Sequence, residues 1–125
     1  MKKLIKCACL VKQHENKLLL VRVRNNKHWY LPGGKIEEFE LAEDALKREL
    51  SEELNIDLLD KTIKYLCTVT DQAYGEDALV ELVCFTADWK GSIYPSAEIS
   101  EAEWIDITNE HLLAPAVIKL VKQHL

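Results

Sequence analysis

Three glutamates, Glu49, Glu52 and Glu53, stand close together within residues 34–56. On a helix these positions are related by i,i+3 and i,i+4, so their carboxylates crowd one patch of the surface. Like charges at those spacings repel each other, and a stable helix needs a cation beside them. Because hard divalent metals prefer carboxylate oxygens as ligands, the segment predicts a metal-binding catalytic site.

A helix over residues 41–54 is predicted to carry these glutamates. Its apolar stripe consists of Ala42, Ala45, Leu46 and Leu50. At 100° per residue, Glu49 and Glu53 fall beside this stripe on the inward side, whereas Glu52 lies further round. A solvated acidic face would lie opposite the stripe, so the two inward glutamates must be hydrogen-bonded, paired or metal-bound. We expect the helix to end at Asn55, because asparagine tolerates the left-handed conformation that follows many helices.

The remaining residues predict a mixed α/β (α+β) domain, with a mostly antiparallel sheet and a helix on either side. Apolar and β-branched residues predict strands at residues 5–12, 17–24, 62–71, 78–89 and 104–107. Polar residues 14–16 indicate that the first two strands form a hairpin, and residues 74–77 indicate a second hairpin. We expect a loop at residues 91–100 and a closing helix that begins at Pro115. The length predicts one domain, residues 1–125.

Composition excludes several classes of protein. No apolar run approaches the roughly 20 residues of a membrane span, so we expect no membrane association. The net charge of −5 argues against stable nucleic-acid binding, which would need a basic surface. The four cysteines have no zinc-ligand spacing and lie in apolar, strand-like stretches. They predict buried free thiols in a reducing compartment, and therefore a cytoplasmic protein.

The acidic segment resembles the Nudix box, which reads Gly, five residues, Glu, seven residues, Arg-Glu, an apolar residue, any residue, Glu-Glu, any residue, Gly, an apolar residue. Eight of its nine defined positions match in register: Gly34, Glu40, Arg48, Glu49, Leu50, Glu52, Glu53 and Ile56. The departure is Asn55, where the family has glycine. A softer departure is Phe39, where many members have glycine before the first glutamate of the box.

The resemblance implies Mg²⁺- or Mn²⁺-dependent hydrolysis of a pyrophosphate bond in a nucleoside diphosphate linked to another group. It also implies an α/β/α sandwich around a mixed sheet, in which the box forms a loop–helix–loop. By resemblance to MutT-like members, we expect a nucleoside triphosphate or a related small nucleotide as substrate. The alternatives are a nucleotide-sugar, ADP-ribose or dinucleoside-polyphosphate pyrophosphatase and, in another class, a nucleotide-sensing Nudix domain without catalysis. A homodimer is compatible with the sequence.

The resemblance also assigns roles within the box. The expected metal ligands are the Gly34 carbonyl and the carboxylates of Glu49, Glu52, Glu53 and Glu98. Arg48 is expected to orient these carboxylates through ion pairs, for instance with Glu52, and Glu40 to support it. Glu53 is the favoured general base and Glu98 is next. Glu52 and Glu101 remain further candidates.

Substrate-binding residues are expected outside the helix. Arg22 and Arg24 either bind phosphate or are ordinary charges on the surface of a strand. Trp29 and its neighbour Tyr30 either stack on the base or pack at the edge of the core, and Trp104 is expected in the core. Phe39 and the Tyr74 loop are further candidates for choosing the substrate.

Overall fold

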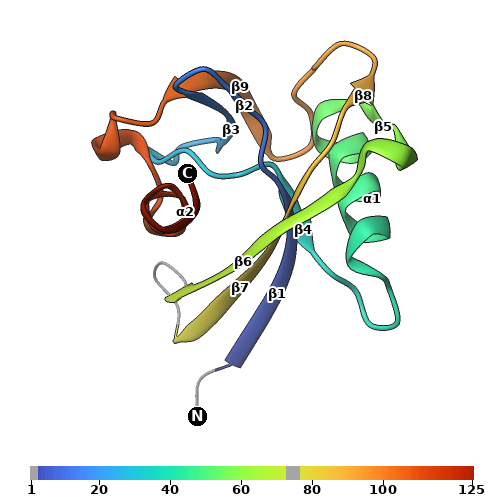
Figure 1. Ribbon diagram of the computed structural model, residues 1–125, viewed down its shortest axis with the longest axis horizontal. Helices are drawn as coiled ribbons and strands as arrows, with labels where there is room; N and C mark the ends of the chain where they lie inside the picture. The colour runs from blue at the N-terminus through green and yellow to red at the C-terminus, as the bar shows by residue number, and fades with distance from the viewer. Residues whose placement is uncertain (1–2, 73–76) are drawn as a thin grey trace.

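The computed structural model describes residues 3–72 and 77–125, and a four-stranded sheet runs through its middle (Figure 1). In the order β4–β1–β7–β6, its strands are β4 (Gly33–Lys35), β1 (Lys3–Leu10), β7 (Ala78–Thr86) and β6 (Lys64–Gln72). Only β1 and β7 pair in parallel, while β1 with β4 and β6 with β7 are antiparallel. The predicted mixed, mostly antiparallel sheet is confirmed. The turn expected at residues 74–77 falls outside the described residues except for Asp77.

A second sheet contains β2 (Gln13–His14), β3 (Lys17–Val23) and β9 (Ile99–Asp106), and a short ladder joins β5 (Asp57–Leu58) to β8 (Trp89–Lys90). The predicted hairpin between the first two long strands is wrong, because β1 pairs with β4 and β7 whereas β3 pairs with β2 and β9. The polar turn does lie in a hairpin, but it joins the short β2 to β3. The other partners of β1 and β3 come from distant parts of the chain. The strand predicted at residues 104–107 begins earlier, at Ile99, which shortens the loop before it.

Two helices, α1 (Ala42–Leu54) and α2 (Pro115–His124), cover opposite sides of the sheets (Figure 1). The side chains of β1 alternate between two apolar cores, as the period of a strand requires. Ala8 and Leu10 belong to the core that contains α1, whereas Cys9 and Val11 belong to the core that contains α2. The α/β/α sandwich is confirmed. Short 3₁₀ turns occupy Asp60–Thr62 and Glu110–Leu112.

The ends of both helices follow the local sequence. Asn55 adopts the left-handed conformation, with φ 59° and ψ 34°, and its N–H donates to the Ser51 carbonyl at 3.1 Å. The predicted end of α1 is therefore confirmed. Pro115 is the first residue of α2, where its missing N–H is no loss.

The cysteine thiols are buried or half-buried, as expected, whereas one tryptophan is more exposed than expected. All four cysteines are free; three are buried, and Cys7 is half-buried. Trp104 is 40% exposed, so its predicted place in the core is wrong. It lies opposite the buried Leu19 in the β3–β9 ladder and edge-on to His14 at a centroid distance of 6.3 Å. Within residues 3–72 and 77–125, no helix is long and apolar enough to cross a membrane.

Candidate metal and catalytic site

Glu53 is the buried carboxylate of the site. Its residue is only 5% exposed, and the Gly33 N–H donates to its Oε1 at 3.3 Å. Burial raises the pKa of Glu53 to about 8, and the charges of Glu49, Glu98 and Glu52 push it in the same direction against the lowering effect of the Gly33 hydrogen bond. The Glu53 carboxyl therefore holds a proton at neutral pH unless a cation stabilises its ionised form.

Gly34 allows the carboxylate of Glu49 to approach the main chain. A Cβ atom on Gly34 would lie 2.3 Å from the Glu49 carboxyl carbon, well inside contact distance. A larger residue at this position would push the carboxylate away from β4. The glycine is thus part of the arrangement that puts Glu49 next to the Gly34 backbone, where the resemblance places a carbonyl ligand.

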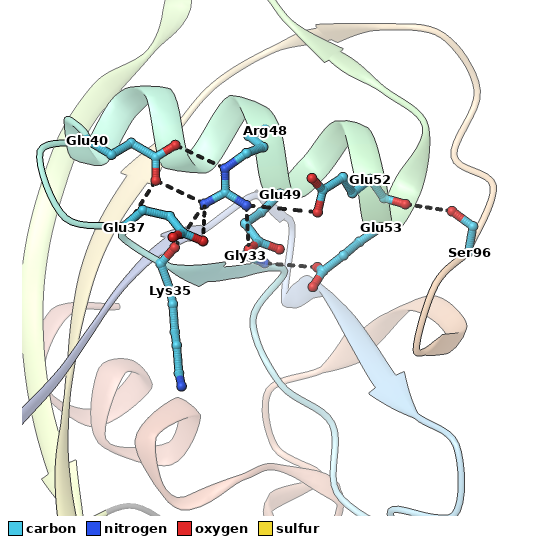
Figure 2. Close-up of polar contacts among 9 residues, drawn as sticks. All are labelled: Gly33, Lys35, Glu37, Glu40, Arg48, Glu49, Glu52, Glu53 and Ser96. Atoms are coloured by element: carbon cyan, nitrogen blue, oxygen red, sulfur yellow. Dashed lines mark hydrogen bonds and ion pairs between the residues drawn. The ribbon is translucent and has the colours of Figure 1, made fainter.

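Arg48 binds carboxylates on α1 and in the loop before it (Figure 2). It binds Glu40 in a bidentate manner, with Nε to Oε2 at 3.0 Å and Nη2 to Oε1 at 2.9 Å. Its Nη1 donates to Glu49 Oε1 at 3.0 Å, and its Nη2 to the Lys35 carbonyl at 3.1 Å. The ion pair with Glu52 is longer, at 3.9 Å. The guanidinium thus joins the loop before α1 to the glutamates on the helix.

The pKa values of this pair reflect the same contacts. The hydrogen bond from Arg48 and one from the Glu37 N–H lower the pKa of Glu40 to about 2. The pKa of Arg48 is raised by its hydrogen bonds to Glu40 and Glu49. Glu40 is therefore a permanently ionised anchor for the guanidinium, whereas Glu53 changes its charge near neutral pH.

Arg48→Lys is expected to weaken metal binding and turnover by roughly 10- to 100-fold, as is typical when a partner that orients metal ligands is lost. Lysine keeps the charge but cannot form the bidentate contact with Glu40. Metal titration by calorimetry and steady-state kinetics measure both effects. Lys47→Arg is the matched control, because Lys47 pairs with Asp60 and Asp44 away from Glu49. Unchanged metal affinity in Arg48→Lys would contradict the orienting role.

The donor set of the site fits a hard divalent cation. Glu49, Glu52 and Glu53 offer only anionic oxygen atoms, and Glu98 is near enough for its charge to act on Glu53. In the part of the chain that the structure describes, no three acidic, histidine or cysteine side chains converge at metal-ligating spacing. The carboxylates of Glu49 and Glu52 do not converge with that of Glu53 because both form ion pairs with Arg48.

The two glutamates expected to reach in from the second sheet have different surroundings. Glu101 is the cross-strand neighbour of Arg22, and the two side chains form an ion pair. Glu98 lies in the turn before β9, and its charge raises the pKa of Glu53. Of the two, Glu98 is therefore the one near the site.

The expected substrate-binding residues do not form one cluster. Trp29 is 6% exposed, and its ring lies 5.1 Å from the Arg22 guanidinium carbon, so packing at the edge of the core describes it better than base stacking. The side chain of Arg24 is exposed, while its N–H donates to the Glu98 carbonyl at 3.4 Å. Phe39 is 99% exposed at a φ of 66°. Tyr74 lies outside the described residues.

A cavity of about 260 Å³ borders the same segment, and sequence reasoning did not find it. Its walls are mainly apolar and come from β1, β4, β6, β7 and the start of α2, with Gly33 and Gly34 at one side. Because the walls of the cavity come from five separate segments, no local sequence motif predicts it. The only local signal is the alternation of Cys7 and Cys9 on β1, which turns both thiols to the same face.

Most of the chain matches a known protein family. The family profile described as NUDIX domain matches residues 3–123. This chain belongs to the Nudix family. It is a Nudix pyrophosphohydrolase; Nudix hydrolases generally use divalent metal ions and act on small nucleotides.

Two curated relatives and two solved structures are similar to this Nudix hydrolase. An 8-oxo-dGTP diphosphatase of Buchnera aphidicola is 35% identical over 100 residues, which cover 73% of this chain and 68% of that protein. The uncharacterized Nudix hydrolase YvcI of Bacillus subtilis is 29% identical over 79% of this chain and 64% of its own length. The ORF135 protein of E. coli is 26% identical, with a TM-score of 0.76 over 97% of this chain and 88% of that one. A MutT Nudix hydrolase from Burkholderia pseudomallei shares the fold, with a TM-score of 0.82, 21% identity and 98% of both chains covered.

Proposed function

We propose that this Nudix hydrolase cleaves a pyrophosphate bond of a nucleoside triphosphate or a related small nucleotide with Mg²⁺. The observation that carries the proposal is the buried carboxyl of Glu53, beside Glu49 and Glu98 and next to the cavity at Gly33. The relative named as an 8-oxo-dGTP diphosphatase supports a nucleoside triphosphate as substrate. Mn²⁺ is the expected substitute, because it accepts the same oxygen ligands.

In the proposed mechanism, Glu49, Glu52, Glu53, Glu98 and the Gly34 carbonyl would hold the metal ion. When bound, the ion neutralises phosphate charge and lowers the pKa of water. Glu53 accepts the proton of the attacking water, and its position on a rigid helix fixes the direction of that transfer. The cavity beside Gly33 is proposed to receive the nucleobase, because its walls are mainly apolar.

Arg48 contributes without touching the substrate. Its bonds to Glu40 and Glu49 hold the loop before α1 and the helix in one arrangement. Arg22 and Arg24 are proposed to attract the phosphate chain, since the net charge of −5 does not. Arg24 is the freer of the two, because Arg22 is paired with Glu101. Phe39 is proposed to contact the substrate from the tip of the loop.

A product analysis tests the proposal. The protein is incubated with Mg²⁺ or Mn²⁺ and a panel of nucleoside triphosphates, including 8-oxo-dGTP, together with nucleotide sugars, ADP-ribose and dinucleoside polyphosphates. Release of a nucleoside monophosphate from triphosphates is the expected result, and ¹⁸O-labelled water then identifies the attacked phosphorus. Cleavage of only a nucleotide sugar or dinucleotide would replace the proposed substrate. Tight nucleotide binding without cleavage of any compound would indicate a sensing domain.

Binding of Mg²⁺ near neutral pH is expected to release a proton from Glu53, because its pKa is about 8 and the metal requires the ionised carboxylate. Calorimetry in buffers of different ionisation enthalpy measures this proton. The release should vanish above about pH 9, where Glu53 is already ionised, and metal affinity should rise with pH up to that point. It should also vanish in Glu53→Gln. An equal release in the variant would assign the proton to another group.

The same pKa predicts how the metal-free protein responds to pH. The pKa of Glu53 is higher in the folded than in the unfolded chain, so the folded state binds the proton more tightly. Its contribution to stability is therefore complete below the ordinary glutamate pKa of about 4.5 and is lost as the pH rises through about 8. Thermal unfolding in the presence of a chelator should show this loss, which Glu53→Gln should abolish.

Two broader assignments complete the proposal. We propose one domain over residues 1–125, because the matched residues 3–123 include every strand, the whole of α1 and all but the last residue of α2 in the part that the structure describes. The four free thiols support a reducing, cytoplasmic location.

A further inference from the structure

The last turn of α1 is closed by a loop from a distant part of the chain. Helix ends leave their final carbonyls without partners inside the helix. In α1 each of them accepts a hydrogen bond: Ser51 from the Asn55 N–H at 3.1 Å, Glu52 from the Ser96 hydroxyl at 2.6 Å, Glu53 from the Ser96 N–H at 2.8 Å and Leu54 from the Tyr94 N–H at 2.9 Å. Two of these carbonyls belong to the residues that carry the proposed metal-binding carboxylates. Figure 2 shows the Ser96 hydroxyl at the Glu52 carbonyl.

The side chain of Asn55 adds a second tie between the helix end and this loop. Its Nδ2 donates to the Tyr94 carbonyl at 2.6 Å and to the Ser96 hydroxyl at 3.1 Å. The Nudix box has glycine at this position, and glycine has no side chain to make these bonds. Asn55 therefore adopts the left-handed backbone conformation for which the box uses glycine. In addition, its side chain binds the loop.

The loop leads directly to Glu98. The Ile99 N–H donates to the Ser96 carbonyl at 3.1 Å, so residues 96–99 form a tight turn with Ala97 and Glu98 at its centre. Ala97 has a φ of 56°, a conformation that alanine rarely adopts and that surrounding contacts must maintain. One end of the turn is fixed at Ser96 by the contacts with α1. The other end is held by the β3–β9 ladder and by the Arg24 N–H at the Glu98 carbonyl. The bonds of Ser96 are therefore the ones that tie Glu98 to α1.

We propose that Asn55 is a positioning residue, whose side-chain bonds to Tyr94 and Ser96 hold Glu98 beside the glutamates of α1. The proposal rests on the proposed function, in which Glu98 is a metal ligand or base. Asn55 itself touches neither metal nor substrate. In this chain the departure from the glycine of the box therefore fixes Glu98, which among the proposed carboxylate ligands is the one outside α1.

Asn55→Gly tests the proposal, because glycine keeps the left-handed backbone and the N–H bond to Ser51 and loses only the side-chain bonds. We expect kcat to fall about tenfold with little change in the KM for nucleotide, since misplacing a reacting group costs rate more than binding. Hydrogen exchange at the Tyr94 and Ser96 amides should be faster in the metal-free variant. Glu15→Gly is the matched control, because it places glycine at another positive φ, of 56°, in the β2–β3 turn. It should leave kcat, KM and the hydrogen exchange unchanged.

A double-mutant cycle with Glu98→Gln separates positioning from a general structural role. If Asn55 acts through Glu98, Asn55→Gly has no further effect on kcat once Glu98 is changed. Equal losses in both backgrounds would overturn the proposal, as would a wild-type kcat in Asn55→Gly.

Mn²⁺ binding, followed by electron paramagnetic resonance without nucleotide, keeps the test independent of the substrate. Asn55→Gly should weaken Mn²⁺ binding several-fold when Glu98 is present and not when Glu98 is glutamine. Unchanged Mn²⁺ affinity would overturn the proposal. If the wild-type protein cleaves no nucleotide but shows this pattern, only the proposed function fails.

Discussion

Glu53→Gln is expected to reduce turnover by roughly 10²- to 10⁴-fold at saturating Mg²⁺, the range typical of a lost general base. The amide cannot accept the proton of the attacking water, and it is a poor ligand for a divalent ion compared with a carboxylate. Steady-state kinetics on the best substrate of the panel measures the loss.

The fold of this variant should remain intact. Its amide oxygen can still accept the Gly33 N–H, and it is neutral like the protonated carboxyl that Glu53 carries at neutral pH. A melting temperature equal to or above that of the wild type would show that the loss of turnover is chemical. Glu43→Gln is the control on the same helix, because Glu43 lies exposed in the first turn of α1. Wild-type turnover in Glu53→Gln would remove Glu53 from the mechanism and leave Glu98 as the next base to test.

Gly33→Ala is expected to have the largest effect on stability. A Cβ atom here would lie 2.0 Å from the Ala8 carbonyl oxygen, and the φ of Gly33 is 142°. The clash is with main-chain atoms of β1, which cannot move without breaking the ladder between β1 and β4. We expect a loss of about 3 kcal/mol or more in the free energy of unfolding, measured by denaturation with urea.

Gly91→Ala separates the clash from the backbone strain. Gly91 also has a positive φ, of 97°, but a Cβ atom there would be 3.4 Å from its nearest neighbour, the Asn55 carbonyl oxygen. We expect this variant to lose about 1 kcal/mol, the cost of the strained conformation alone. Equal losses in the two variants would contradict the importance of the contact with Ala8. Gly33→Ala should also lower turnover, because the Gly33 N–H donates to Glu53.

The properties of α1 could be predicted from its sequence because they depend on neighbours a few residues apart. The spacing of the apolar residues set the buried face, and the same rotation placed Glu53 inward and Glu52 outward, as their burial confirms. Asn55 ends the helix for a local reason, since it tolerates the left-handed conformation. The order of residues in the box identified the family on the same local basis.

Contacts between distant segments were harder to predict. Strand propensity located β1 and β3 but not their partners, because pairing depends on which strands bury both faces together. Trp104 shows the same limit: it lies opposite the buried Leu19 and is nevertheless 40% exposed, because its burial depends on which distant segments cover that part of the sheet. The ion pair between Glu101 and Arg22 also joins two distant strands and could not be read from spacing along either one.

The sequence by itself therefore determined the chemistry of the site: a helix that presents carboxylates on its inward edge, in a register typical of pyrophosphate cleavage. Only the tertiary structure decided how that chemistry is held in place. The cavity beside Gly33 and the loop tied to Asn55 join residues far apart in the chain. Such contacts arise when separate elements pack together, so they cannot be deduced from spacing along one element.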